Sequence, residues 1–155
     1  MKLHNYIQRE RVIRYISVIL FILYISYLTY LTLFDHGYGR QFLNRSINLI
    51  PFKTILQYLM NTSSIRAIIV NIAGNIAAFL PMGFLLPLVW DKCRNFKICC
   101  LIILMATICI EVLQYITGAG ASDIDDVILN CLGGMLGYFL LFNTLMKTKY
   151  DRRVS

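Results

Sequence analysis

Residues 96–142 read FKICCLIILMATICIEVLQYIT-GAGAS-DIDDVILNCLGGMLGYFLLF, two long apolar runs separated by five small residues. About 20 helical residues cross a hydrocarbon core about 30 Å thick, so each run is long enough to span a membrane. The whole chain is 58% hydrophobic and 15% charged, with a mean hydropathy of +0.65, which is too apolar for an ordinary soluble domain. Runs of this kind occur at about residues 12–34, 66–90, 96–117 and 123–142.

The apolar runs predict an all-α integral membrane bundle of four transmembrane helices, in a single domain over residues 1–155. No segment alternates with the period of two that a membrane barrel needs, and helices are then the way to pair every backbone group in lipid. The first run is longer than the apolar part of a secretory signal and lacks an Ala-x-Ala-like exit. We therefore expect it to remain as an anchor.

The net charge of +7 is concentrated on one side of this arrangement. With four spans, the first tail, the loop after the second run and the last tail all lie on the same side. By the positive-inside rule, both termini are predicted to be cytoplasmic, in a multi-pass protein of the bacterial plasma membrane. The basic tails are expected to meet membrane lipids with anionic headgroups, and no nucleic acid partner is predicted. These segments hold Lys2, Arg9, Arg11, Arg14, Lys92, Arg94, Lys97, Lys147, Lys149, Arg152 and Arg153.

The loop over residues 35–65 is predicted to contain a short amphipathic helix just after Pro51, a residue typical of a first helical turn. This helix either lies in the outward-facing membrane interface or packs on the bundle as a lid. Its apolar face has the spacing i, i+3, i+4, i+7 and consists of Phe52, Ile55, Leu56 and Leu59.

Glycine and proline mark the second and fourth runs. Gly133 and Gly137 have the GxxxG spacing that lets two helices approach closely. Pro81 and Pro87 each remove a backbone hydrogen bond, which predicts a kink in the second run. The five cysteines lack the spacing of a zinc site, and we interpret them as small apolar fillers. Neither a metal nor a cofactor is predicted.

Polar side chains interrupt the last three runs at matching depth. At 1.5 Å per helical residue, most of them lie between roughly 5 and 14 Å below the outward surface. Spacings of three or four residues place the polar groups of each helix on one face, whereas Asp125 points elsewhere. Ionisable groups at such depth are costly and mark a functional site by default. The set comprises Asn71, Asn75, Glu111, Gln114, Asp123, Asp126 and Asn130.

Several of these polar residues also have structural explanations. Ser122 can cap the fourth helix, with Asp125 in a capping-box-like position. The amides of the set can join helices through hydrogen bonds worth about 1 kcal/mol or less each. Glu111 can stay protonated in apolar surroundings, or it can pair with Arg45 or Arg66 from the outward side.

Three kinds of chemistry fit the set. Glu111 and Asp126 can divide acid and base work if their surroundings differ. Together with Asp123, they can instead hold a divalent ion through oxygen ligands. An acidic, amide-rich pocket can also bind a cationic or hydroxylated headgroup without catalysing a reaction. The sequence contains no serine, cysteine or histidine arranged as an activated nucleophile.

Several blocks of the chain resemble the VanZ family. They occur in the family's order over about residues 44–140 and read RSINLIPF (45–52), NIAGNIAAFLPMGF (71–84), EVLQ (111–114), DIDDVILN (123–130) and GG (133–134). The resemblance implies a small bacterial membrane protein linked to reduced susceptibility to teicoplanin-type glycopeptide or lipoglycopeptide antibiotics. It implies no mechanism.

The family pattern places its polar residues on Arg45, Asn48, Asn75, Glu111, Gln114, Asp123, Asp126 and Asn130, with Pro51, Pro81 and Gly134 beside them. Many relatives carry an arginine near the position of Gly120, so the acidic cluster here lacks that local partner. Arg45 or Arg66 can substitute for it.

We therefore expect an outward-facing binding site around Glu111 and Asp126. It would engage a lipid, a lipid-linked cell-wall precursor or a glycopeptide antibiotic. The alternative is a membrane-embedded enzyme that modifies a lipid-linked substrate, with Glu111 and Asp126 as acid and base. A small transporter or an interaction partner of cell-wall enzymes is a third class. The expected binding residues are Arg45, Asn48, Asn71, Asn75, Gln114, Asp123 and Asn130.

Overall fold

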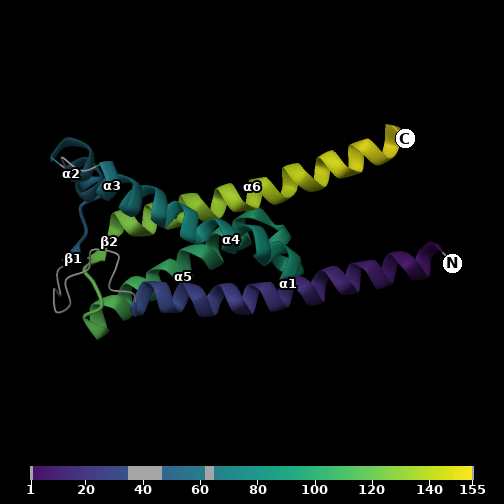
Figure 1. Ribbon diagram of the computed structural model, residues 1–155, viewed down its shortest axis with the longest axis horizontal. Helices are drawn as coiled ribbons and strands as arrows, with labels where there is room; N and C mark the ends of the chain where they lie inside the picture. Colours follow the sequence, from purple (N-terminus) through teal and green to yellow (C-terminus); the bar gives the residue numbers. More distant parts are fainter. Residues whose placement is uncertain (1, 35–46, 62–64, 155) are drawn as a thin grey trace.

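The computed structural model describes residues 2–34, 47–61 and 65–154, and it places long helices side by side (Figure 1). The long helices are α1 (Lys2–Leu33), α4 (Gly74–Val89), α5 (Phe96–Thr117) and α6 (Ile124–Val154). Shorter elements join them: β1 (Ile47–Asn48), α2 (Lys53–Asn61), α3 (Ile65–Ile68), the π-helical turn η2 (Ile69–Ala73), the 3-10 turn η3 (Asp91–Arg94) and β2 (Ser122–Asp123).

The predicted all-α bundle with four spans is confirmed in the described part of the chain. The stretches long and apolar enough to cross a membrane are Arg11–Leu33, Ile69–Val89, Phe96–Thr117 and Ile124–Thr144. Their outer faces carry exposed apolar side chains such as Leu23, Leu101 and Leu140, as expected where the surrounding solvent is lipid.

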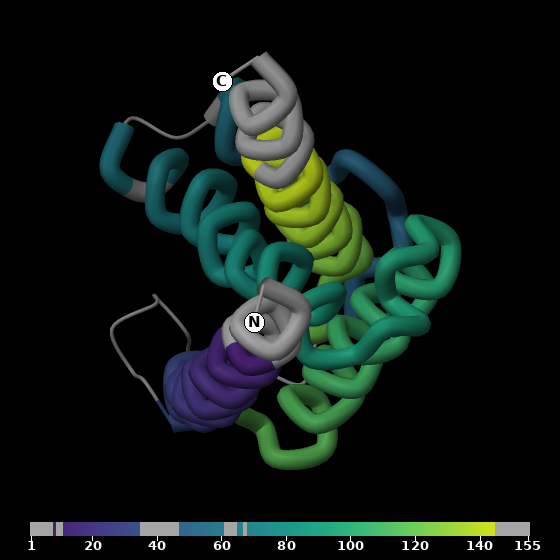
Figure 2. The backbone as a smooth tube through the Cα atoms, turned by 90° about the vertical axis from the view of Figure 1, so that its right-hand side faces the viewer, coloured from purple at the N-terminus to yellow at the C-terminus, as the bar shows by residue number. Residues whose placement is uncertain are grey.

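The two ends of the bundle differ in what they hold. Both chain termini lie at one end, which we call the terminal end, and Figure 2 views the molecule from that side. The strands β1 and β2 and the helix α2 lie at the opposite end, which we call the loop end (Figure 1). The described termini therefore share a side, as the predicted topology requires.

Glycines let α6 lie directly on α4. A Cβ atom added at Gly133 would lie 2.1 Å from the carbonyl oxygen of Ile76, and one at Gly137 would lie 1.9 Å from that of Leu80. On the facing helix, a Cβ at Gly83 would lie 1.8 Å from the carbonyl oxygen of Gly134. The predicted role of the GxxxG spacing, close helix packing, is thus confirmed.

The irregular part of the second span is not where its prolines lie. The helix α4 continues through both Pro81 and Pro87. The departure from α-helical spacing comes earlier, at η2, where the chain forms a wider π-helical turn around Asn71. Such turns are rare and are frequently found at functional sites.

Apolar side chains fill the middle of the bundle. Phe79 and Ile103 are buried at its centre, where Cys93 and Cys99 pack against the same cluster. These two thiols therefore serve as the small apolar fillers that the sequence suggested, whereas Cys109 is exposed.

The predicted amphipathic helix in the first loop exists as α2. Its amino-terminal end is attached to α6 by hydrogen bonds described below, while Leu56 and Leu59 on its apolar face remain exposed. The helix is thus anchored on the bundle at its first turn and presents apolar side chains to its surroundings.

Candidate functional site

Two neighbouring groups of polar side chains occupy the loop end. The first, which we call the loop network, consists of Asn48, Thr54, Asp123 and Asp125. The second lines a small buried cavity between α1, α4, α5 and α6, and we call it the polar cavity.

A parallel pair of two-residue strands builds the loop network. Register pairs Asn48 of β1 with Asp123 of β2, and the Asn48 side-chain amide donates to Asp123 Oδ1 at 2.9 Å. The same amide donates to Thr54 Oγ1 at 3.0 Å, and the Thr54 hydroxyl donates in turn to Asp123 Oδ2. Two side chains of the first loop and one from the start of the last span therefore close one ring of hydrogen bonds.

Asp125 is completely buried and caps a helix other than its own. Its carboxylate accepts from the backbone N–H groups of Phe52, Thr54 and Ile55, at 2.5, 2.8 and 3.1 Å. These are donors at the start of α2 that have no partner within that helix. A carboxylate there also faces the positive end of the helix dipole, so Asp125 fixes α2 to the bundle.

The capping role predicted for Ser122 is therefore wrong. Asp123 occupies that role, because its Oδ1 accepts from the backbone N–H of Asp125 at 2.9 Å and α6 begins at Ile124. Asp125 does not complete a capping box on its own helix. It points away from the polar cavity, as its helical position predicted, and reaches α2 instead.

The polar cavity has a volume of about 20 Å³, enough for roughly one water molecule. Glu111, Gln114 and Asn130 are each about 95% buried there, with 5%, 4% and 4% of their surfaces exposed. Asn75 and Asp126 complete its polar lining, so the structure brings together five of the residues that the sequence placed at matching depth. No lysine or arginine appears among the described residues that line it.

Neutral amide donors hold the polar side chains of the cavity in place. The Asn75 amide donates to Asp126 Oδ1 at 2.5 Å, which joins α4 to α6. The Gln114 amide donates to the carbonyl oxygen of Thr32 at 3.0 Å, which joins α5 to α1. Glu111 Oε2 accepts from the backbone N–H of Asp123 at 2.9 Å and thereby connects the cavity to the loop network.

Asn130 supplies the least satisfied polar atom of the cavity. Its side-chain amide donates to Thr107 Oγ1 at 2.8 Å, whereas its Oδ1 is buried and has no hydrogen-bond partner among the described residues. Leaving a buried acceptor unpaired costs about 1–3 kcal/mol. This oxygen is therefore the position in the cavity best suited to accept a hydrogen bond from a bound group.

Tyr58 of α2 lies within the electrostatic influence of Asp126 and Asp123. Its side chain is half-buried, and burial together with the negative charges of Asp126 and Asp123 raises the pKa of its hydroxyl above 10.0. Sequence reasoning missed Tyr58 and Thr54. The available signal was their four-residue spacing on the polar face of a helix predicted from its apolar face.

The remaining predicted residues fall outside this grouping. Asn71 is half-buried in the wide turn η2 and does not line the cavity. Arg45 lies outside the described residues, so its pairing with Glu111 stays a prediction. Within the described residues, no group of three histidine, cysteine, aspartate or glutamate side chains has the arrangement of a metal site. The divalent-ion alternative thus gains no support from the arrangement of its three carboxylates.

Comparison with known proteins gives one consistent result. The family model of VanZ/LLP1 matches residues 21–147, which include all four candidate spans except the start of the first. The Protein VanZ of Enterococcus faecium is 33% identical over 111 residues, which cover 70% of this chain and 62% of that protein. The match thus spans less than two thirds of the length of this relative. No solved structure matches the chain.

Proposed function

This chain belongs to the VanZ/LLP1 family, and from that premise we propose that it lowers susceptibility to teicoplanin-type glycopeptide or lipoglycopeptide antibiotics in a bacterial plasma membrane. The protein acts by engaging a lipid or a cell-wall precursor through the polar cavity and the loop network. In the proposed orientation both groups face outward, because the positive-inside rule favours a cytoplasmic position for the end that carries the basic residues of the tails and of η3.

The observation that supports this proposal most strongly is the convergence of polar groups from three helices on one cavity. Asn75, Glu111 and Asp126 come from α4, α5 and α6 and would each be costly in lipid without partners. Simple helix association does not require five polar side chains around one cavity, because small residues already let α6 contact α4.

The chemistry of the cavity selects the kind of group that it would bind. Its carboxylates and the free acceptor of Asn130 favour a donor, such as an ammonium or a hydroxyl group. Its volume of about 20 Å³ admits only the tip of such a ligand, so the rest of a headgroup would lie against the loop network and α2. Tyr58 and the exposed apolar side chains of α2 are placed to contact it there.

Growth inhibition by teicoplanin in a sensitive Gram-positive host tests the proposal. Cells expressing wild type are expected to tolerate more antibiotic than cells with an empty vector, and Asp126→Asn is expected to lose that protection at equal membrane level. The matched control is Asp151→Asn, which makes the same chemical change in the tail after the last span. Equal protection by Asp126→Asn and Asp151→Asn contradicts the proposed role of the cavity.

A second candidate function is supported by one feature of the cavity. Glu111 is almost fully buried and Asp126 is half-buried, yet both line the same space. Two carboxylates in different surroundings can act as acid and base, and a water molecule fits between the walls. This membrane-embedded enzyme would leave a covalently altered lipid or precursor. Mass spectrometry of lipid extracts distinguishes the two functions. An unchanged lipid and precursor profile on expression contradicts the enzyme but is compatible with the binding proposal.

A further inference from the structure

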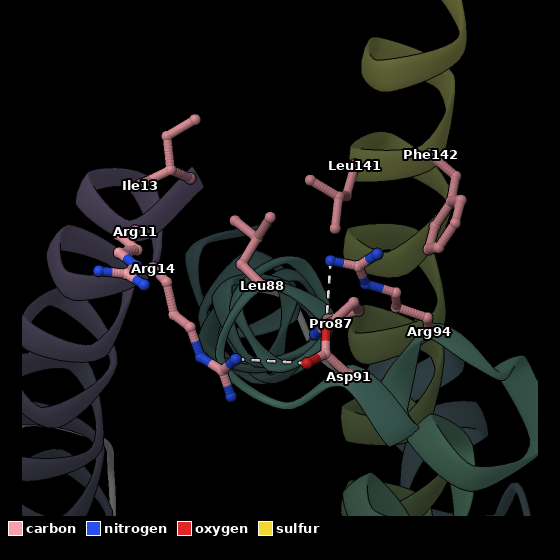
Figure 3. Close-up of a pocket in the computed structure, with 9 residues that line it drawn as sticks. All are labelled: Arg11, Ile13, Arg14, Pro87, Leu88, Asp91, Arg94, Leu141 and Phe142. Carbon is pink, nitrogen blue, oxygen red and sulfur yellow. Dashed lines mark hydrogen bonds and ion pairs between the residues drawn. The ribbon is translucent and has the colours of Figure 1, made fainter. Parts of the chain in front are cut away.

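A basic cleft of about 390 Å³ opens toward the terminal end (Figure 3), and it shares no lining residue with the polar cavity. It lies between residues 11–14 of α1, the end of α4 with η3, and residues 141–142 of α6. Three arginines line it, Arg11 and Arg14 from α1 and Arg94 from η3. Apolar side chains complete its walls, with Leu88 between the helices and Leu141 and Phe142 on the side of α6.

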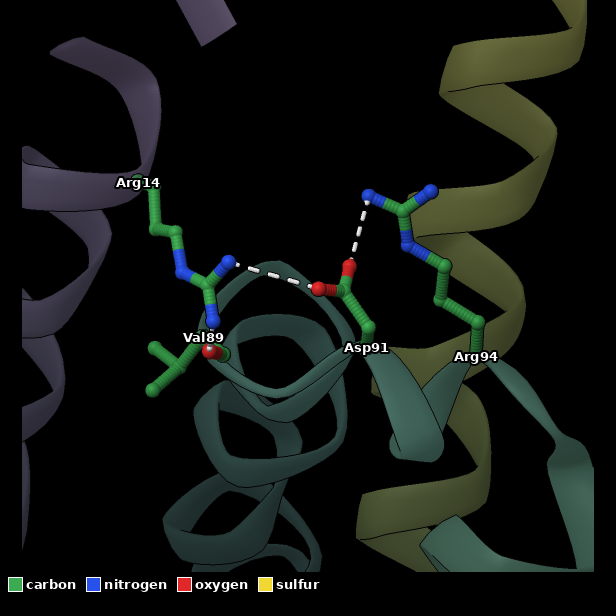
Figure 4. A network of polar contacts seen from close by, with 4 residues as sticks. All are labelled: Arg14, Val89, Asp91 and Arg94. Atoms are coloured by element: carbon green, nitrogen blue, oxygen red, sulfur yellow. Dashed lines mark hydrogen bonds and ion pairs between the residues drawn. The ribbon is translucent and has the colours of Figure 1, made fainter. Parts of the chain in front are cut away.

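Asp91 holds two of the arginines at the cleft (Figure 4). Arg14 lies 3.3 Å and Arg94 3.1 Å from the two oxygens of this carboxylate, and Arg14 also donates to the carbonyl oxygen of Val89 at 3.3 Å. Three positive charges thus face one negative charge. The Arg14 and Arg94 side chains remain 57% and 61% exposed, so their guanidinium groups keep donors available for an anion.

The depth of the cleft matches the boundary between hydrocarbon and headgroups. Arg11 is the first residue of the candidate span of α1, and Val89 is the last of the second span. On α6, Leu141 and Phe142 lie within the last turn of the span that ends at Thr144. Lipid phosphates lie at this level of a bilayer, beside the ends of the acyl region.

We propose that this basic cleft binds one anionic phospholipid, with its phosphate between Arg11, Arg14 and Arg94 and an acyl chain along Leu88, Leu141 and Phe142. Arginine forms forked, charge-assisted hydrogen bonds to phosphate, and basic pockets between transmembrane helices are suited to anionic headgroups. The apolar walls favour a phospholipid over free phosphate, because free phosphate would gain nothing from them. The site is independent of the function proposed for the loop end.

The single tryptophan of the chain provides a local probe of this cleft. Trp90 lies between Val89 and Asp91, is 46% exposed, and is the residue whose fluorescence a brominated acyl chain would quench. The purified full chain is placed in phosphatidylcholine vesicles that contain either brominated phosphatidylglycerol or brominated phosphatidylcholine at equal mole fraction. The proposal predicts stronger quenching by the brominated phosphatidylglycerol.

Charge variants test whether the cleft causes this preference. Each of Arg14→Gln and Arg94→Gln is expected to lower the preference for phosphatidylglycerol by roughly fivefold, the scale of one cation at a membrane surface. The matched control is Lys97→Gln, which removes the same charge from an exposed residue of α5 outside the cleft. Equal losses in Lys97→Gln and the arginine variants overturn the proposal, because a general surface charge would then explain the binding.

Asp91→Asn is expected to change the preference for phosphatidylglycerol in the opposite direction, a result that misfolding would not produce. It removes the negative charge that competes with phosphate for Arg14 and Arg94, so the preference for phosphatidylglycerol is expected to rise. A fall in this variant contradicts the proposal. Excess inorganic phosphate at constant ionic strength separates the two sources of phosphate: the preference is expected to persist, and its disappearance identifies a free-anion site instead.

Discussion

The loop end and the terminal end of this bundle place their carboxylates in opposite environments. At the loop end, the carboxylates of Glu111 and Asp125 are buried and accept hydrogen bonds from backbone N–H groups. At the terminal end, Asp91 is 63% exposed and is paired directly with two arginines. Buried acids held by neutral, fixed donors stabilise one particular arrangement, whereas exposed ion pairs in water contribute about 0–1 kcal/mol.

This difference indicates which charges the fold depends on and which are available to ligands. Asp125 has the environment of a structural residue. It is completely buried and accepts hydrogen bonds from three backbone N–H groups, so a ligand cannot reach its carboxylate. Asp126 and Asn130 line a cavity, and the three arginines line an open cleft. Position in the bundle, rather than residue type, therefore separates the carboxylate enclosed by backbone donors from those that line a cavity or a cleft.

Asp125→Ala is expected to have the largest effect on stability. It removes three hydrogen bonds to a charged acceptor, each worth about 1.5–3 kcal/mol, so a loss of at least about 3 kcal/mol is expected after relaxation. Unfolding in detergent, followed by circular dichroism, measures the loss. Hydrogen exchange should also show faster exchange in α2. An effect no larger than that of Asp91→Ala would contradict the contrast between the two ends.

Asn75→Ala is expected to have an intermediate effect. It removes the amide that donates to Asp126 Oδ1 at 2.5 Å, and a hydrogen bond to a charged group contributes about 1.5–3 kcal/mol to stability. The control is Asn143→Ala, the same change at an exposed position of α6. Equal unfolding midpoints for the two variants would show that the Asn75–Asp126 contact adds nothing to the packing of α4 on α6.

Asp91→Ala is expected to change stability by less than about 1 kcal/mol, because both of its ion pairs are exposed and screened by salt. Its unfolding midpoint should also be nearly independent of added salt. A loss comparable to that of Asp125→Ala would mean that Asp91 fastens α1 to η3 structurally. The terminal end would then resemble the loop end.

Tyr58→Phe is expected to have the smallest effect on stability, and this effect is expected only at alkaline pH. Burial and the charges of Asp126 and Asp123 raise the pKa of Tyr58 in the folded state, while the unfolded side chain ionises near 10.0. The contribution to stability is therefore complete below pH 10.0 and decreases as the pH rises above it. Tyr58→Phe should lose less stability than wild type between about pH 9 and pH 11. Parallel curves would mean that neither burial nor the two carboxylates raise the pKa of Tyr58 in the folded state.

Much of the fold could be predicted from the sequence because a membrane span is a local property. The predicted run at 96–117 matches Phe96–Thr117, and the other spans agree within a few residues, because length and hydropathy decide where a helix meets lipid. Depth counted along each helix also brought Asn75, Glu111 and Asp126 to one level, where the structure places them around one cavity.

The rest depends on contacts between distant segments. Nothing in the local pattern of Asn48 or Asp123 predicts that β1 and β2 pair, and the capping-box-like position of Asp125 on its own helix does not predict that it caps α2. The wide turn η2 changes the number of residues per turn around Asn71, so the four-residue spacing that should have aligned it with Asn75 no longer does so. The basic residues predicted an orientation, but not that Arg11, Arg14 and Arg94 line one cleft.

The amount of fluorescent teicoplanin bound per cell is the direct test of whether the polar cavity acts on the target of the antibiotic. A sensitive Gram-positive host would express wild type or Asp126→Asn at equal membrane level, with Asp151→Asn as the control. Reduced antibiotic binding is expected with wild type and Asp151→Asn, and binding at the level of the empty vector is expected with Asp126→Asn. Equal binding in all four strains would contradict the claim that the polar cavity acts on the target of the antibiotic.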